Sequence, residues 1–436
     1  MKLKDRLLDF LLRLYAWFFR AAPSQEMRIF LESILFVFVA TGISKGLWFV
    51  MNVAGGRVLG PTTYGEYTLI VSIAGFLAIP AGFGVMGGLV RRLAEEEDEG
   101  RRKRIISTAV IYTSLTLAAI TVVYVLLHQQ FAALARMGPH TFLIAVSVFL
   151  VTVAASLTQL LLQGLHRQKT WAIVTITTSA AGFVGFVWLL IAGVRNILLL
   201  YVPFVLGSIL FSTAVLLILH KYISPRTFDA KEFKWMFHFG AYIFLVSIAT
   251  TLLGNLDRVM LNYYLGAEAV GLYQAYYFSS IMFVGVLTGI FTQVFFPTAV
   301  KLKGLRNMLR KLDKVVVAGV LGSLVLVPIL VGIIIALYHY PLFWTSLILF
   351  TLATAVDVAQ VLYSTLLSAQ GISGVRRTTA GIFASFVLNA ILNVILIPLF
   401  SLNGAVLAFI LSLGLQAIYL RVALGRMGDT RQGVSR

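Results

Sequence analysis

Two stretches of the chain, Leu59-Gly-Pro-Thr-Thr-Tyr-Gly-Glu-Tyr67 and Leu265-Gly-Ala-Glu-Ala-Val-Gly-Leu-Tyr273, share the pattern L-G-x4-G-x-Y at an offset of 206 residues. A second pair, Gln163-Gly164 and Gln370-Gly371, recurs at an offset of 207 residues. Two matches at almost the same offset indicate an internal repeat, and such a repeat determines the architecture of the whole chain. We therefore expect two halves with the same fold, joined near residue 222.

The composition indicates the solvent in which this repeat folds. The chain has 436 residues, of which 59% are hydrophobic and 12% are charged, and its mean hydropathy is +0.93. An ordinary soluble domain is about one quarter charged, so this chain has too little polar surface for a soluble fold. It contains no cysteine, which excludes disulfides, thiolate metal sites and a cysteine nucleophile.

Twelve apolar segments have the roughly 20 residues that a membrane-spanning helix needs. The first six cover about 30–54, 66–90, 105–127, 141–165, 170–193 and 196–219, and the second six about 237–264, 270–298, 315–338, 342–369, 377–398 and 403–424. The repeat offset covers six helices, an even number, so both halves have the same orientation in the membrane. The sequence thus predicts an all-α integral membrane protein with halves at residues 26–222 and 223–436.

The basic residues predict the orientation. The chain has 35 Lys and Arg against 17 Asp and Glu, a net charge of +18. Arg57, Arg136 and Arg195 fall on one side of the twelve-helix topology, Lys45 and Arg258 fall inside spans, and every other Lys and Arg falls on the opposite side. Cytoplasmic loops carry such an excess, so we expect both termini in the cytoplasm of a cell-membrane protein. The charge is then a topology signal, and no nucleic-acid partner is expected.

Residues 1–25 differ from the spans. Leu7, Leu11 and Trp17 alternate with basic residues such as Arg6 and Arg13. This pattern is typical of an amphipathic helix on the cytoplasmic leaflet, and a frayed tail is the alternative.

Polar residues inside the spans are the candidate site, because each costs free energy in lipid and needs a reason. Helical spacing places Thr41, Lys45 and Asn52 on one face of the first span and Asn255, Arg258 and Asn262 on one face of the seventh. The 206-residue offset relates Asn52 to Arg258, so both faces can line one cavity between the halves. The predicted substrate-cavity residues are Lys45, Asn52, Asn255, Arg258 and Asn262. The alternative for Arg258 is a local pair or a packing hydrogen bond.

Two buried acids are candidates for ion coupling. Asp257 and Asp357 could each bind a proton or Na⁺, or instead make a packing hydrogen bond. Asn389 and Asn393 are spaced for hydrogen bonds between helices. No Walker loop, H-E-x-x-H or G-x-S-x-G motif occurs, so we expect no metal site, no cofactor and no enzyme activity.

These segments together resemble a known family. The carrying residues are Arg57–Tyr67, Asn255-Leu-Asp-Arg258 with the second L-G-x4-G-x-Y stretch, and Asn389-x3-Asn393 followed by Ile397-Pro398 and Gly404-Ala405. From about Arg28 to Leu424 the chain is similar to polysaccharide-biosynthesis flippases of the multidrug/oligosaccharidyl-lipid/polysaccharide exporter superfamily. The resemblance implies two six-helix bundles in a V around a central cavity. It also implies that a polyprenyl-(di)phosphate-linked oligosaccharide moves from the cytoplasmic to the outer leaflet by alternating access.

The implied partners are the polyprenyl-linked glycan, membrane lipids, H⁺ or Na⁺, and polysaccharide assembly proteins. Cations can neutralise the substrate phosphate, while amides and hydroxyls can replace the hydration of the sugars. Few cations lie deep in the spans, which favours a monophosphate or neutral-sugar carrier. The rival interpretations are a cation-coupled multidrug exporter of the same superfamily, a lipid scramblase, and a membrane polymerase or glycosyltransferase, which the short outer loops disfavour.

Overall fold

The computed structural model describes residues 13, 25–224, 227–289, 291–292 and 305–433, and this part of the chain is helical without any strand. The predicted amphipathic helix at residues 1–25 lies outside the described residues, apart from Arg13 and Gln25. The prediction of an all-α protein is confirmed.

The helices follow the apolar segments closely. The first half contains α2 (Gln25–Ala81), α3 (Val85–Glu95), α4 (Glu99–Leu126), α5 (His128–Leu134), α6 (Pro139–Gly164), α7 (Gln168–Ile191) and α8 (Leu198–Ile218). After the short turn η1 (His220–Tyr222), the second half contains α9 (Ala230–Leu265), α10 (Ala267–Tyr277), the π-helical segment η2 (Phe278–Met282), α12 (Leu305–Tyr338), α13 (Trp344–Ser368), α14 (Ile372–Phe400) and α15 (Leu402–Gly433). Helical structure continues from α10 through η2 to Gly289.

Ten helices in the described ranges are long and apolar enough to cross a membrane, or eleven when the bent α9 is taken as one span. The sequence predicted twelve. The first two predicted spans lie in the single long element α2, which is interrupted at Gly60, where the backbone is not helical. The second predicted span also ends earlier than expected, because α2 stops at Ala81 and α3 begins separately at Val85. The count of twelve therefore stays a prediction.

The sequence repeat is also a structural repeat. Gly60 and Gly266, which are 206 residues apart, both have positive φ, 72° and 86°, in the conformation that glycine adopts without a steric penalty. Each begins a helical segment that crosses its counterpart. A Cβ on Gly65 would lie 1.8 Å from the carbonyl oxygen of Ala267, and a Cβ on Gly271 would lie 1.9 Å from that of Pro61. Only glycine lets the two backbones approach this closely.

The same end of the bundle is sealed by tyrosines. The hydroxyls of Tyr64 on α2 and Tyr338 on α12 are 3.3 Å apart, and the hydroxyl of Tyr340 donates to the carbonyl of Gly56 at 2.7 Å. Tyr64 and Tyr338 are completely buried. These contacts join the two halves, so we call this end the closed end.

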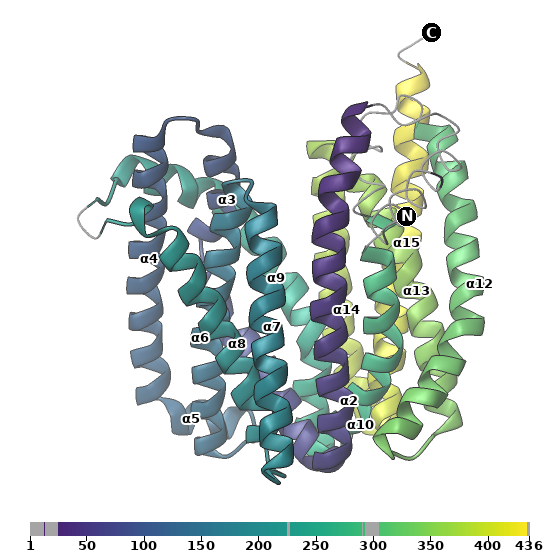
Figure 1. Ribbon diagram of the computed structural model, residues 1–436. Coiled ribbons are helices and arrows are strands. Elements are labelled where there is room, and N and C mark those ends of the chain that lie inside the picture. The colour runs from purple at the N-terminus through teal and green to yellow at the C-terminus, as the bar shows by residue number, and fades with distance from the viewer. Residues whose placement is uncertain (1–12, 14–24, 225–226, 290, 293–304, 434–436) are drawn as a thin grey trace.

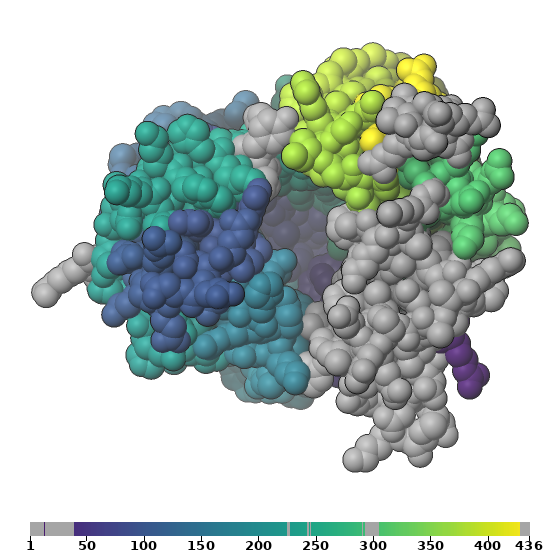
Figure 2. All heavy atoms as spheres, turned by 90° about the horizontal axis from the view of Figure 1, so that it is seen from above, coloured from purple at the N-terminus to yellow at the C-terminus, as the bar shows by residue number. Residues whose placement is uncertain are grey.

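The opposite end carries the clusters of basic residues and is called the basic end here. It holds Arg91, Arg92, Arg101, Arg102, Lys103, Arg104, Arg376, Arg377, Arg421 and Arg426. Toward the upper edge of Figure 1, where this end lies, α3 and α4 stand apart from α12 and α15. Seen from that end, a deep hollow separates the blue and teal helices of the first half from the yellow-green helices of the second (Figure 2).

One helix crosses from the second half to the first. α9 packs against α3, where a Cβ on Gly240 would meet the carbonyl oxygen of Gly84. Arg92 donates to both carboxylate oxygens of Glu232, at 2.6 and 2.9 Å, and this hydrogen bonding raises the pKa of Arg92. α9 then bends by 52° between its segments Ala230–Ala241 and Val246–Leu265. The division at residues 222/223 stays a prediction, and the contacts of α9 with α3 cross it.

The outer surface of the helices is apolar, as a lipid-facing surface must be. Large hydrophobic side chains that would be costly to expose to water stand outward on most helices. Examples are Leu126, Val184, Trp188, Ile191, Val325 and Leu399. The chain is therefore a multi-pass membrane protein.

Candidate functional site

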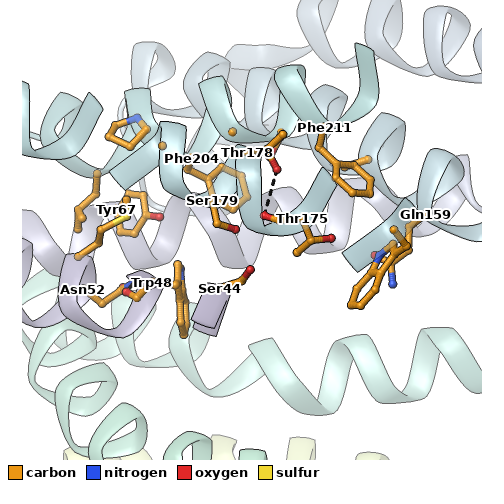
Figure 3. Close-up of a pocket in the computed structure, with 18 residues that line it drawn as sticks. Ser44, Trp48, Asn52, Tyr67, Gln159, Thr175, Thr178, Ser179, Phe204 and Phe211 are labelled. Carbon is orange, nitrogen blue, oxygen red and sulfur yellow. Dashed lines mark hydrogen bonds between the residues drawn. The ribbon is translucent and has the colours of Figure 1, made fainter. Parts of the chain in front are cut away.

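Inside the first half lies a recess that we call the aromatic pocket. It has a volume of about 270 Å³ and lies between α2, α6, α7 and α8. Flat side chains form much of its wall, and hydroxyl and amide groups stand between them (Figure 3). The aromatic members are Trp48, Tyr67, Trp171, Phe204 and Phe211, and the polar members are Ser44, Asn52, Gln159, Thr175, Thr178, Ser179 and Ser208.

Two hydroxyls of this pocket have no hydrogen-bond partner within the described part of the chain. They are Ser44 Oγ and Thr175 Oγ1, and both atoms are buried. Buried polar atoms are nearly always hydrogen-bonded, so a pair of unpartnered hydroxyls on one pocket indicates a place for a ligand. Thr178 instead donates to the carbonyl of Val174 at 2.8 Å.

Asn52, the second predicted cavity residue, lies at the pocket wall and is 3% exposed. Its amide nitrogen donates to the carbonyl of Trp48 at 2.9 Å. Its amide oxygen accepts a longer hydrogen bond, 3.4 Å, from the hydroxyl of Tyr64. Asn52 therefore links the aromatic pocket to the tyrosine seal of the closed end.

Lys45 lines a second recess, the Lys45 crevice, which lies between α2 and the helical segment Ala267–Gly289. The crevice has a volume of about 530 Å³. Apart from Thr41 and Lys45, its described lining is apolar or glycine, and Lys45 is the single charged member among the described residues. The Lys45 ammonium lies 5.4 Å from the centre of the Trp48 ring, and Trp48 borders both the crevice and the aromatic pocket.

A third recess, the Thr251 crevice, is the counterpart of the Lys45 crevice in the repeat. It has a volume of about 300 Å³ and lies between α9 and the second segment of α2. Ser247 and Thr251 line it, at the positions related by 206 residues to Thr41 and Lys45. Asn255, one turn further along α9, donates to the carbonyl of Thr251 and packs against Gly75.

Arg258 and Asp257 lie in a buried polar network that we call the Arg258 cluster. Arg258 is 6% exposed, and its Nε donates to Gln274 Oε1 at 2.7 Å. Another guanidinium nitrogen donates to the carbonyl of Gly254, and the guanidinium carbon lies 4.4 Å from the ring centre of Tyr277. The geometry matches the packing alternative for Arg258, since its partners belong to the protein itself.

Asp257 is bound from two other helices. Its carboxylate accepts from the hydroxyl of Tyr273 on α10 at 2.8 Å and from the amide of Asn393 on α14 at 2.7 Å. Asn393 also donates to Asn389, and Asn389 donates weakly to Ser412 on α15. The prediction that the two asparagines join helices is confirmed.

The remaining candidates lie elsewhere. Asn262 donates to the carbonyls of Ala135 and Arg136, at 3.1 and 3.2 Å, and so ties α9 to the turn after α5 at the closed end. Asp357 is partly exposed on α13, and its carboxylate makes no hydrogen bond to another residue in the described ranges. Lys45 and Asn52 lie in adjoining recesses, whereas Asn255, Arg258 and Asn262 each have separate surroundings.

Sequence reasoning missed most of the aromatic pocket. Trp48, Gln159, Trp171 and Thr175 lie on three helices and form one wall only after folding. A signal was present in α7, where Trp171, Thr175, Thr178 and Ser179 recur at helical spacing within an otherwise apolar span. Gln274 was also missed, because the sequence does not show that it meets Arg258, 16 residues away along the chain.

Comparison with known proteins now identifies the family. The polysaccharide biosynthesis protein family matches residues 30–303, more than half of the chain. The chain belongs to this family. A relative at the level of sequence is the probable low-salt glycan biosynthesis flippase Agl15 of Haloferax volcanii, 24% identical over 412 residues, which cover 89% of this chain and 82% of the relative.

Solved structures agree on the fold of this family member. An inward-facing multidrug resistance MATE family transporter of the MOP superfamily superposes with a TM-score of 0.69 at 14% identity, covering 88% of this chain and 96% of the transporter. The lipid II flippase MurJ in an inward closed conformation gives a TM-score of 0.62 at 17% identity, covering 90% of this chain and 87% of MurJ. Both likenesses concern the fold, and they agree with the helical membrane fold that the resemblance implied.

Proposed function

We propose that this protein is a flippase that moves a lipid-linked oligosaccharide across the membrane for cell-surface polysaccharide or glycan biosynthesis. The observation that carries the proposal is the adjoining pair of recesses, one uncharged and rich in hydroxyls and one with a lysine, inside a membrane protein of the polysaccharide biosynthesis family. A sugar needs the first environment and a phosphate needs the second. The Agl15 relative, a probable glycan biosynthesis flippase, supports the same class of substrate.

The proposed orientation places the basic end in the cytoplasm, with both termini on that side of the plasma membrane. The excess of Lys and Arg at that end supports it. The proposed topology has twelve spans in two six-helix bundles, with the broken α2 crossing the membrane twice. The hollow at the basic end then opens to the cytoplasm, where lipid-linked glycans are assembled, and movement of one half against the other opens the closed end.

The Lys45 crevice is the proposed site of the substrate phosphate. A phosphate cannot enter hydrocarbon without a counter-charge, and the ammonium of Lys45 supplies one. The crevice walls are mostly apolar and belong to helices of different halves, so the polyprenyl tail can remain in lipid while the head enters. A single cation suits a monophosphate carrier better than a strongly anionic one.

Asp257 is the proposed site of ion coupling, with H⁺ or Na⁺ as the driving ion. Beside its carboxylate, Asn393 Oδ1 is buried without a partner among the described residues. The carboxylate of Asp257 on α9 and Asn393 Oδ1 on α14 offer ligands for a cation. A bound ion would change how these two helices pack. Asp357 is the second candidate. Association with polysaccharide assembly proteins completes the proposal, in which the protein carries out transport and no covalent chemistry.

The multidrug exporter of the same superfamily is the less supported alternative. Its cationic substrates would be repelled by Lys45, and the aromatic pocket has no carboxylate in its described lining to attract them. A polymerase or glycosyltransferase would need catalytic groups in a large outer loop, and the connections of the closed end are short. A scramblase would move lipid without an ion gradient.

Deletion of the gene and reconstitution of the purified protein test the proposal together. Deletion should cause polyprenyl-linked glycans to accumulate, as measured by mass spectrometry of extracted lipids. In proteoliposomes, wild-type protein should move a synthetic polyprenyl-phosphate glycan under an H⁺ or Na⁺ gradient, and Asp257→Asn should lose the gradient dependence. Accumulation of no lipid-linked glycan, together with export of an organic cation, would favour the multidrug exporter.

A further inference from the structure

The aromatic pocket has a composition that the phosphate site does not explain. We infer that it is a subsite for one uncharged hexose, the sugar unit joined directly to the phosphate of the carrier. The inference rests on the proposed flippase function and adds the identity of the sugar end of the substrate. Four observations carry it: the aromatic faces, the unpartnered hydroxyls, the absence of charge in the described lining, and the position beside Lys45.

The aromatic faces match the shape of a pyranose. A hexose ring has apolar C–H faces and a rim of hydroxyls, and an indole ring provides a flat surface of similar size. Trp48 on α2 and Trp171 on α7 belong to the pocket wall, together with Phe204 and Phe211. Small-molecule sites combine such apolar walls with a few convergent polar groups. The volume of about 270 Å³ lies near the lower limit of roughly 300 Å³ for such sites, which fits one sugar unit.

The unpartnered hydroxyls indicate where the hydroxyl groups of the bound sugar lie. Ser44 is 9% exposed and its Oγ is buried, and Thr175 Oγ1 is buried on the facing helix. Each hydroxyl can donate one hydrogen bond and accept others, which are the same capacities that a sugar hydroxyl has. Figure 3 shows Ser44 and Thr175 on opposite sides of the same space. A ligand that carries hydroxyls satisfies both atoms, whereas an apolar ligand leaves them unsatisfied.

The described lining of the pocket includes no Lys, Arg, His, Asp or Glu. A phosphate or a sugar acid would have to lose its hydration without gaining a counter-charge, which a buried site penalises. The pocket therefore selects an uncharged sugar and rejects a uronic acid of the same size.

The position of the pocket identifies which sugar it holds. Ser44 lines the pocket and the next residue, Lys45, lines the adjoining crevice, while Trp48 borders both. A phosphate at Lys45 thus places the sugar attached to it against Trp48. The sugar farther along the glycan has no such constraint.

Binding measurements with three synthetic lipids test the subsite. The lipids are polyprenyl monophosphate, the same lipid with one neutral hexose, and the same lipid with one hexuronic acid, each added to the full-length protein in nanodiscs. The neutral hexose lipid should bind about tenfold more tightly than either of the others. Equal affinity of all three lipids for the wild-type protein would overturn the inference.

Variants assign that preference to the pocket. Ser44→Ala combined with Thr175→Val should remove the hexose preference and leave the affinity for polyprenyl monophosphate unchanged. Thr177→Val is the matched control, because Thr177 lies on the same helix outside the pocket and already donates to the carbonyl of Ile173. Lys45→Gln should weaken all three lipids by the same factor. A full hexose preference in the folded double variant would refute the subsite.

Two further outcomes separate this inference from the flippase proposal. A free methyl hexoside should compete poorly with the hexose lipid, and complete competition at equal concentration would identify a free-sugar site and overturn the assignment to the lipid-linked unit. Binding with the expected preference but without translocation in proteoliposomes would contradict the flippase and support the subsite. Translocation of hexose lipid with a preference unaffected by the double variant would contradict the subsite alone.

Discussion

Asn52 and Arg258 occupy equivalent positions in the two halves, and their surroundings differ. Asn52 borders an open pocket whose described lining is uncharged. Arg258 is bonded to Gln274 and packed against Tyr277, so its guanidinium is occupied by the protein. The preceding residues differ in the same way, because Met51 contributes to the pocket wall while Asp257 binds Tyr273 and Asn393.

The comparison shows how equivalent positions in a repeat can serve different purposes, one joining helices and the other leaving room for a ligand. Buried charges are tolerated only when hydrogen bonds replace their hydration, and a network that achieves this fixes the helices that contribute to it. The second half therefore has a bonded junction of α9, α10 and α14. The first half uses neutral groups at the same place, which leaves room for a ligand. The two halves keep the same backbone conformation where the two repeats cross, because there each half packs directly against the other.

The largest expected loss of stability comes from substituting the glycines at this crossing. Gly271→Ala places a Cβ against the carbonyl of Pro61, and Gly65→Ala places one against Ala267. Because backbone atoms cannot move aside as side chains do, each substitution should lower the free energy of unfolding by about 3 kcal/mol. Thermal unfolding of the purified protein in detergent measures this loss. The control is Gly322→Ala on α12, where an added Cβ meets no atom within 4 Å and stability should be unchanged. Equal stability of Gly271→Ala and the control would mean that the halves do not cross here.

The next largest loss of stability is expected for Arg258, the charged residue of the equivalent pair Asn52 and Arg258. Arg258→Met leaves Gln274 Oε1 buried without its donor, so it should cost about 2 kcal/mol of stability. Asn52→Met removes one short hydrogen bond and one long one beside an open pocket, and it should cost less than about 1 kcal/mol. Denaturant unfolding of both variants gives the difference. A larger loss for Asn52→Met would reverse the division of tasks described above.

Much of this fold could be predicted from the sequence because lipid imposes strong rules. Apolar length predicted the helices, and the sequence repeat at 206 residues recurs in the structure as the same backbone conformation at Gly60 and Gly266. The close approach of the two repeats at Gly65 and Gly271 was not predicted. The break after Ala81 was not predicted, because the apolar run of the second span continues through residues 82–84 without a charge. Hydropathy reports burial in lipid, whereas a turn between two packed helices depends on tertiary contacts.

The site was predicted less well, for a physical reason. Helical spacing correctly places polar residues on one face, but it does not show which neighbour that face meets. The repeat relates Lys45 to Thr251, yet the two residues lie in two separate crevices because each helix packs against a different partner in the other half. The aromatic pocket combines residues of four helices, and one sequence without its contacts does not associate Trp48 with Thr175.

The smallest effect distinguishes the two crevices. Lys45→Thr should slow translocation of a polyprenyl-phosphate glycan about tenfold, equivalent to about 1.4 kcal/mol, because the phosphate loses its counter-charge. The protein itself loses only the contact of the ammonium with the Trp48 ring. Thermal unfolding should therefore stay the same, since the Lys45 side chain is exposed in its crevice.

Adding Thr251→Lys moves the cation to the equivalent crevice, which is bordered by Gly75, Phe244 and Ser247 and does not share Trp48 with the aromatic pocket. If the substrate needs its phosphate and first sugar in adjoining recesses, the double variant should remain as slow as Lys45→Thr in proteoliposome assays. Recovery of the wild-type rate would show that either crevice serves, and that the two halves are functionally equivalent despite their different interiors.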